Sequence, residues 1–288
     1  MIKELVIISG KGGTGKTSIS GSFAALSESK VMADCDVDAA DLHIIMNHKV
    51  LSDESFSTSR KAVIDPDACI SCGKCAELCR FDAITDDFKV KTLSCEGCGV
   101  CAAFCPAEAI KMADHESGRW FISETDKGPL VHACLGMAEG NSGKLVALLR
   151  KKAREIAEEK GYNLIIVDGS PGTGCPVIAS VTGASYLLIV TEPTVSGLHD
   201  LKRALELAAH FRVKSGVCVN RADINSDVAS EIEKYCVSTG IDFLGTIPYD
   251  KDVTRAQIAG KSVVEHSEGP ASKSIKELWN RVKNEILV

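Results

Sequence analysis

The residues Gly10-Lys11-Gly12-Gly13-Thr14-Gly15-Lys16-Thr17 decide the fold, because they follow one periodic segment and open another. The apolar run Leu5–Ser9 predicts a buried strand, and residues 16–29 predict a helix. A glycine-rich loop between a strand and a helix presents backbone N–H groups to phosphates. The weaker dinucleotide-binding pattern Gly10-x-Gly12-x-x-Gly15 also fits, but the Lys16-Thr17 ending favours a nucleoside triphosphate.

The loop predicts specific roles for its residues. Backbone N–H groups are expected to cradle the phosphates of ATP or GTP, and they belong to Gly12, Gly13, Thr14, Gly15, Lys16 and Thr17. Lys16 is expected to contact the β- and γ-phosphates, and Thr17 to bind Mg²⁺. Asp168 follows the apolar run 164–167 and fits the acid that holds Mg²⁺ through water.

Strand-like and helix-like segments alternate over most of the chain. Further apolar runs lie at 31–35, 164–167, 186–190, 213–219 and 241–247, and helical patterns at 144–160, 197–210, 227–238 and 272–287. Such alternation predicts an α/β fold, with a mostly parallel sheet covered by helices on both faces. Ligands bind at the carboxyl ends of the strands in such sheets, where the polar motifs of this chain fall.

Two four-cysteine runs interrupt the alternation. They are Cys69-x2-Cys72-x2-Cys75-x3-Cys79 and Cys95-x2-Cys98-x2-Cys101-x3-Cys105-Pro106. This spacing is typical of [4Fe–4S] clusters in which the fourth cysteine of each run binds the other cluster. One cluster is therefore assigned to Cys69, Cys72, Cys75 and Cys105, and the other to Cys95, Cys98, Cys101 and Cys79. The alternative is zinc, which usually pairs C-x2-C units across a longer spacer.

The cysteine segment is an internal duplication. A shift of 26 residues superposes the two runs, and it also maps Ala83-Ile84 onto Ala109-Ile110. We therefore expect a discontinuous nucleotide domain, residues 1–60 and 115–288, with a small α+β domain inserted at 61–114.

The bulk properties limit the partners and the compartment. The net charge of −6 argues against nucleic acid as the main partner. No stretch is long and apolar enough to span a membrane, and the N-terminus does not read as a signal peptide. We expect a cytoplasmic protein whose cysteines bind metal rather than form disulfides.

With the extra lysine Lys11, the loop resembles that of the deviant-Walker P-loop ATPases, which include MinD, ParA, Mrp-type iron–sulfur carriers and the nitrogenase iron protein. Four further motifs share the resemblance: Asp34-x-Asp36, Asp168-Gly169-Ser170-Pro171-Gly172, Glu192-Pro193, and Asn220-Arg221 before Ile247-Pro248. It implies an ATP-dependent homodimer, in which Lys11 reaches the partner's nucleotide. It also implies that Asp36 orients the attacking water and that Asn220, with Arg221 and Pro248, contacts the base. Asp38 is the alternative catalytic acid, or a helix N-cap, and Lys11 has the alternative of a solvated surface lysine.

The cysteine segment resembles bacterial two-cluster ferredoxins, and Arg80 stands where proline often follows the fourth cysteine. Together the parts resemble MinD-like ATPases with an inserted ferredoxin domain. The leading hypothesis is a Mg²⁺-dependent ATPase that gates electron transfer from two [4Fe–4S] clusters to a partner protein. The alternative is a carrier or scaffold that delivers clusters or metals to an apoprotein. A third possibility, a spatial-organisation ATPase, needs a membrane or DNA tether that the sequence does not offer.

Some weaker signals have structural alternatives. Cys35, Cys218 and Cys236 lie in or beside apolar stretches and are expected to be buried. By resemblance to the nitrogenase iron protein, Cys175 is a candidate ligand of a cluster bridging two subunits, with Cys134 as the second; a plain packed or exposed thiol is the alternative for both. The loop 139–144 is expected to contact nucleotide or to relay its state to the clusters, and the alternative is a plain helix N-terminus capped by Asn141 or Ser142. The C-terminal apolar pattern is expected to pack on the ATPase core rather than on a membrane.

Overall fold

The computed structural model of the protein describes residues 2–136, 139–140 and 142–287. The chain forms two compact units. The large unit comprises residues 1–53, 120–134 and 141–288, and the small unit comprises residues 54–119 and 135–140. The sequence boundaries at 60/61 and 114/115 lie a few residues from these limits, but the segment 135–140 was not expected in the small unit.

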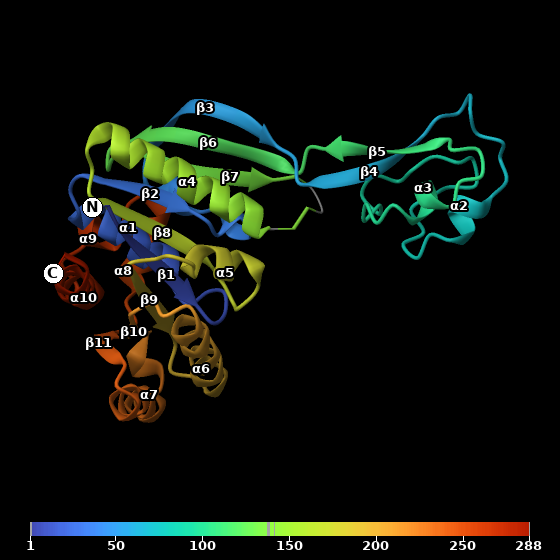
Figure 1. Cartoon of the computed structure of the whole chain (residues 1–288). Coiled ribbons are helices and arrows are strands. Elements are labelled where there is room, and N and C mark those ends of the chain that lie inside the picture. The colour runs from blue at the N-terminus through green and yellow to red at the C-terminus, as the bar shows by residue number, and fades with distance from the viewer. Residues whose placement is uncertain (1, 137–138, 141, 288) are drawn as a thin grey trace. The chain divides into compact units, whose positions relative to one another are not determined.

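The large unit is built on a sheet of nine strands (Figure 1). The strands are β1 (Lys3–Ser9), β2 (Lys30–Asp34), β3 (His48–Phe56), β6 (Gly118–Thr125), β7 (Leu130–Leu135), β8 (Leu164–Pro171), β9 (Tyr186–Thr191), β10 (Ser215–Asn220) and β11 (Asp242–Ile247). Their order is β11-β10-β9-β1-β8-β2-β7-β6-β3. The pairs from β11 to β7 are parallel. Figure 1 shows β6 running opposite to its neighbours β7 and β3. The expected α/β fold with a mostly parallel sheet is confirmed.

Helices cover both faces of this sheet. They are α1 (Lys16–Leu26), α4 (Gly143–Lys160), α5 (Cys175–Val181), α6 (Val195–His210), α7 (Ser226–Thr239), α8 (Lys251–Ile258), α9 (Val263–His266) and α10 (Pro270–Leu287), with short 3₁₀ turns η1 (Val37–Ala39), η2 (Leu42–Ile45) and η3 (Ala222–Ile224). In Figure 1, α4, α5 and α6 lie along one face, and α1 with α9 and α10 lies on the other. Ser142 caps α4 by accepting a hydrogen bond from the Leu145 N–H at 3.2 Å. Asn141, the other cap candidate, lies outside the described residues.

One hydrophobic cluster lies between the sheet and helices α1 and α10, and α4 buries further apolar side chains, among them Leu145, Val146 and Leu149. The central strands bury nearly every side chain, as their apolar runs require. Phe23 of α1 packs against Trp279 of α10 with ring centroids 4.8 Å apart. Ile275, Leu278 and Val282 of α10 belong to the same buried cluster. The expectation that the last helix packs on the ATPase core is therefore confirmed. Within the described residues, no helix has both the length and the apolar character needed to cross a bilayer.

The small unit repeats its backbone with the 26-residue offset of the sequence. It contains an antiparallel pair, β4 (Ser59–Ile64) and β5 (Ile110–His115), and two single-turn helices, α2 (Lys74–Glu77) and α3 (Val100–Ala103). Both helices begin after a glycine with positive φ, Gly73 at 78° and Gly99 at 77°. Asp82 and Glu108 also share a positive φ, 49° and 51°. Equivalent residues thus adopt equivalent conformations, including strained ones that few residue types favour.

Candidate functional site

The phosphate-binding loop joins β1 to α1. Gly15 stands at the N-cap of α1 with φ +91°. A Cβ added there would lie 2.4 Å from Asn220 Nδ2, so both the backbone conformation and the available space require glycine. The open N-terminus of α1 directs unpaired backbone N–H groups toward any phosphate that binds.

A cavity of about 310 Å³ lies at the carboxyl edge of the sheet and extends from this loop. Eight residues of the predicted site line it, namely Gly13, Gly15, Lys16, Thr17, Asp36, Asn220, Arg221 and Pro248. They come from separate parts of the chain that the strand ends bring together. Gly12, Thr14, Lys11 and Asp168 are not among its lining residues.

The phosphate end of the cavity holds a buried ion pair. Lys16 Nζ lies 3.2 Å from Asp36 Oδ2, with side chains 4% and 9% exposed. Burial raises the pKa of Asp36, and Lys16 only partly offsets that effect. In this structure, therefore, the lysine expected to bind phosphate is paired with the acid expected to orient water. The alternative acid, Asp38, is exposed on η1.

Asp168 lies beneath the loop, at the end of β8. Its Oδ1 accepts a hydrogen bond from Ser20 Oγ at 3.0 Å, and the nearby Thr17 side chain favours the charged form of this carboxylate. Its buried Oδ2 has no hydrogen-bond partner in the described part of the chain. Burial raises the pKa of Asp168 to about 6. A carboxylate with a spare oxygen beside the Thr17 hydroxyl fits the chemistry of a hydrated Mg²⁺ ion.

The base end is built by β10 and the loop that follows it. Asn220 Nδ2 donates to the Thr14 carbonyl at 2.7 Å, and Asn220 Oδ1 accepts from the Arg221 N–H at 2.9 Å. The Arg221 guanidinium pairs with Glu192, which follows β9. Glu192 Oε2 also lies 3.5 Å from Lys11 Nζ. Lys11 is therefore ion-paired within its own chain, with a side chain 35% exposed.

Sequence reasoning missed the outer wall of the cavity. Tyr249, Asp250 and Gln257 line it from the start and the body of α8. Asp250 also caps α8 by accepting a hydrogen bond from the Asp252 N–H at 2.9 Å. The signal that could have found them is the polar stretch directly after Ile247-Pro248, because it too follows a strand that ends at this edge.

The small unit brings cysteines of the two runs together. Cys79, from the first run, lines one small cavity with Cys95, Cys98 and Cys101 of the second. Cys79 Sγ accepts a hydrogen bond from the Ala83 N–H at 3.4 Å. The cavity lining contains the thiols of one predicted set and no imidazole.

Two members of the other set, Cys75 and Cys105, pack against one small core. Burial raises the pKa of the Cys75 thiol, and Cys69 and Cys72 raise it further. Bound iron would hold such thiols deprotonated, and thiolates at this spacing are the donors that an iron–sulfur cluster uses. Among residues 2–136, 139–140 and 142–287, no group of three or more His, Cys, Asp or Glu side chains is arranged to hold a metal ion.

The remaining cysteines divide into two kinds. Cys35, Cys218 and Cys236 are fully buried, as expected. Cys175 is exposed at the first position of α5, and Cys134 is exposed near the end of β7. The role of these two as bridging ligands stays a prediction.

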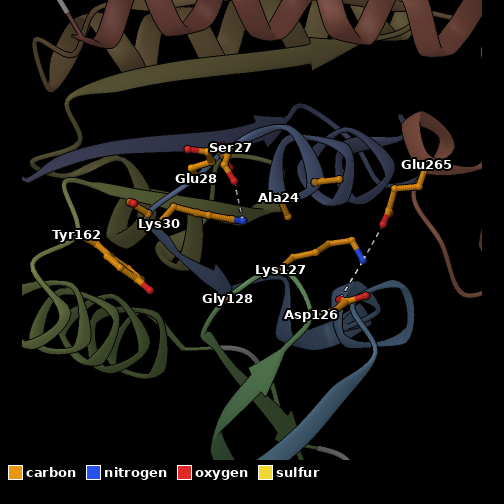
Figure 2. Close-up of a pocket in the computed structure, with 11 residues that line it drawn as sticks. Ala24, Ser27, Glu28, Lys30, Asp126, Lys127, Gly128, Tyr162 and Glu265 are labelled. Carbon is orange, nitrogen blue, oxygen red and sulfur yellow. Dashed lines mark hydrogen bonds and ion pairs between the residues drawn. The ribbon is translucent and has the colours of Figure 1, made fainter.

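A second cavity of about 420 Å³ lies at the opposite, amino edge of the sheet (Figure 2). Lys30 Nζ donates to the Ser27 carbonyl at 2.9 Å, and burial lowers the pKa of Lys30 to about 8. Figure 2 shows Lys127 between Asp126 and Glu265, with Nζ 3.0 Å and 3.2 Å from their oxygens. Lys127 thereby ties the turn after β6 to α9, which is a structural role.

The fold and the loop–cavity geometry define a P-loop nucleotide-binding protein. Residues 5–263 match the CobQ/CobB/MinD/ParA nucleotide-binding domain, and the chain belongs to this family. It is 36% identical to an uncharacterised protein of Methanocaldococcus jannaschii, over 98% of this chain and 97% of that one. It is 28% identical to an iron–sulfur cluster carrier protein of Pyrococcus horikoshii, over 50% of this chain and 53% of the relative.

Solved structures share the fold. The cell division ATPase MinD of Pyrococcus furiosus matches with a TM-score of 0.60 and 18% identity, over 99% of both chains. MinD of Pyrococcus horikoshii in complex with Mg-ADP matches with a TM-score of 0.60 and 15% identity, over 98% of this chain and 96% of that one. The protein therefore has the MinD-like α/β ATPase fold.

Proposed function

We propose that this protein is a Mg²⁺-dependent ATPase that carries two [4Fe–4S] clusters in its small unit, and that its nucleotide cycle gates electron transfer from them to a partner protein. The observation that carries the proposal is the lining of one cavity by Cys79, Cys95, Cys98 and Cys101, in a chain whose large unit holds a P-loop cavity. A set drawn from both cysteine runs is the arrangement that two-cluster ferredoxins require.

The nucleotide step uses the residues of the large unit. Backbone N–H groups of 12–17 bind the phosphates, Lys16 leaves Asp36 for the β- and γ-oxygens, and Thr17 with Asp168 holds Mg²⁺. Asp36, freed from Lys16, orients a water for in-line attack on the terminal phosphate. Asn220, Arg221 and Pro248 form the base end of the cavity.

The active form in this proposal is an ATP-dependent homodimer in the cytoplasm. Lys11 would leave Glu192 and reach the nucleotide of the partner subunit, where its charge stabilises the transferring phosphoryl group. Two ATP molecules would then lie between two copies of the chain. The redox partner is a protein that docks on one conformation of the cycle only, because ATP shifts an equilibrium only through a difference in affinity between two states.

The clusters would be held by Cys69, Cys72, Cys75 and Cys105, and by Cys95, Cys98, Cys101 and Cys79. When bound, they supply one-electron transfer at a potential set by their surroundings. Cys72 and Cys98 are exposed, which places one ligand of each set at the surface, where a partner can approach.

Anaerobic purification with iron and sulfide counts tests the cluster assignment. We expect about eight iron atoms per chain, and about four in Cys79→Ala, because that variant lacks one ligand of one cluster only. The matched control is Cys236→Ala in the large unit, which should keep the wild-type count. A colourless wild-type protein, or an unchanged count in Cys79→Ala, would overturn the assignment.

Gating is tested with dithionite-reduced protein and a one-electron acceptor protein. Acceptor reduction is followed with ATP, with ADP and without nucleotide. We expect the rate with ATP to differ from the other two. Equal rates in all three reactions would reject gating while leaving the clusters and the ATPase untouched.

A second candidate function is delivery of clusters to an apoprotein. The relatives of Pyrococcus horikoshii, Pyrococcus abyssi and Pyrococcus furiosus that are iron–sulfur cluster carrier proteins favour it. Incubation with an apo-ferredoxin separates the two functions. A carrier loses its iron to the acceptor during ATP turnover, whereas an electron-transfer ATPase retains its iron through many turnovers.

A further inference from the structure

Glu192 carries a largely covered carboxylate that faces two cations of the nucleotide site at once. It lies directly after β9, and its side chain is 13% exposed. One oxygen pairs with the Arg221 guanidinium, and the other lies 3.5 Å from Lys11 Nζ. A carboxylate that bridges two cations from distant loops fixes the distance between them.

The backbone around Glu192 holds it in place. Thr194 caps α6 by accepting the Gly197 N–H at 2.9 Å, and its Oγ1 also lies 3.5 Å from Lys11 Nζ. A Cβ added to Gly197 would lie 2.4 Å from the Glu192 carbonyl oxygen, so the turn is closely packed. Glu192 is thus positioned by the turn itself.

Glu192 also closes a ring of contacts around the phosphate-binding loop. Thr14 within the loop accepts from Asn220, Asn220 accepts from Arg221, and Arg221 pairs with Glu192. Glu192 also pairs with Lys11, which belongs to the phosphate-binding loop, and this contact closes the ring. The two ends of the loop are therefore connected through the base-end residues.

We propose that Glu192 is a positioning residue of the nucleotide site, which orients Arg221 toward the base and holds Lys11 within its own chain until nucleotide engages it. The inference rests on the proposed ATP hydrolysis and deepens it. Loss of the charge on Glu192 has two separable effects. Arg221 loses its partner, which weakens nucleotide binding, and Lys11 is released more easily, which speeds turnover.

The test is Glu192→Gln, with nucleotide dissociation constants and kcat measured in parallel. The Arg221 pair is a charge-assisted bond, so we expect ATP to bind about tenfold more weakly. The Lys11 side chain is 35% exposed and its pairing distance is long, so the pair is weak and we expect kcat to rise about threefold. Glu206→Gln, an exposed glutamate on α6, is the matched control and should change neither quantity.

Double-mutant cycles separate positioning from a merely structural role. In an Arg221→Ala background, Glu192→Gln should no longer change the dissociation constant. In a Lys11→Ala background it should no longer change kcat. Effects of equal size in every background, or a loss of thermal stability alone, would overturn the inference. A wild-type protein without ATP turnover would refute the proposed hydrolysis. The ATP dissociation constants would still show whether Glu192 supports nucleotide binding through Arg221.

Discussion

Replacement of Asp36 by asparagine should separate ATP binding from ATP hydrolysis. Lys16 Nζ lies 3.2 Å from Asp36 Oδ2, and both side chains are nearly inaccessible to water. At an effective dielectric constant of about 20, two unit charges at that distance attract by about 5 kcal/mol before any desolvation cost. Nucleotide binding must replace this attraction with one between Lys16 and the phosphates.

The pKa of Asp36 is raised, because burial, with the charges of Asp38 and Asp41, opposes its charged form despite the Lys16 pair. Only a fraction of the gross attraction therefore resists nucleotide binding. We expect Asp36→Asn to bind ATP about tenfold more tightly, a gain of about 1.4 kcal/mol. Hydrolysis should fall by about 10²–10⁴-fold, because the neutral amide cannot orient the attacking water as the carboxylate does.

The assay is equilibrium binding of ATP with Mg²⁺, followed by phosphate release from the same anaerobic preparations. Asp38→Asn is the matched control, since Asp38 is an exposed acid two residues away that offers the same chemistry. Weaker ATP binding by Asp36→Asn would refute the competition between Asp36 and phosphate. Loss of hydrolysis in Asp38→Asn, with normal hydrolysis in Asp36→Asn, would show that Asp38 and not Asp36 orients the attacking water.

Three further predictions concern binding and stability. With a pKa of about 6, Asp168 is about nine-tenths ionised at pH 7 and about one-tenth ionised at pH 5. The affinity for Mg²⁺, measured by titration in the presence of ATP, should therefore fall about tenfold between these pH values. This part of the pH dependence should be absent in Asp168→Asn. Lys30→Met should raise the free energy of unfolding at pH 7 by about 1–2 kcal/mol in urea titrations, because the buried ammonium of wild-type Lys30 is unfavourable. The pKa of Lys30 in the folded protein, about 8, lies below the ordinary lysine pKa of 10.5, so the stability of the wild type rises between these two pH values. The extra stability of Lys30→Met should therefore shrink over this range. A difference in unfolding free energy that stays constant from pH 8 to 10.5 would contradict the reasoning. Gly15→Ala should abolish measurable ATP binding, through its positive φ and the contact with Asn220, whereas Gly183→Ala, which also has a positive φ but lies outside the cavity lining, should retain it.

The fold was predictable wherever local periodicity and tertiary burial agree. The runs at 164–167 and 186–190 lie in β8 and β9, because strands buried on both faces read as continuous apolar segments. The region between β2 and α4 was not predicted in this way. β3 is largely exposed and its sequence, His48–Phe56, carries polar residues throughout, so no apolar run marks it. β3 and β6 are strands because they pair with each other at the edge of the sheet, which is long-range information.

In the candidate site, too, the sequence predicted the residues of a local motif but not the residues placed by long-range packing. Residues of the phosphate-binding loop were identifiable because a local motif carries their chemistry. Tyr249 and Gln257 were not, because their place in the cavity depends on the position of α8 beside residues at and after the ends of β10 and β11. Glu192 was visible only as part of a motif, and its two cation contacts depend on three loops that meet in space.

The cations of the nucleotide site are already neutralised before nucleotide binds. Lys16 is paired with Asp36, and Lys11 and Arg221 share Glu192. In the proposed cycle, a binding phosphate replaces Asp36 as the partner of Lys16, instead of meeting an unpaired positive charge. This exchange lowers the net affinity, but it also obliges Asp36 to change partners when ATP binds, while Glu192 keeps Arg221 and gives up only Lys11. The nucleotide can then alter the geometry at both ends of the cavity by the same event. A site in which Lys16 had no carboxylate partner would bind ATP more tightly and would have no Asp36 to release.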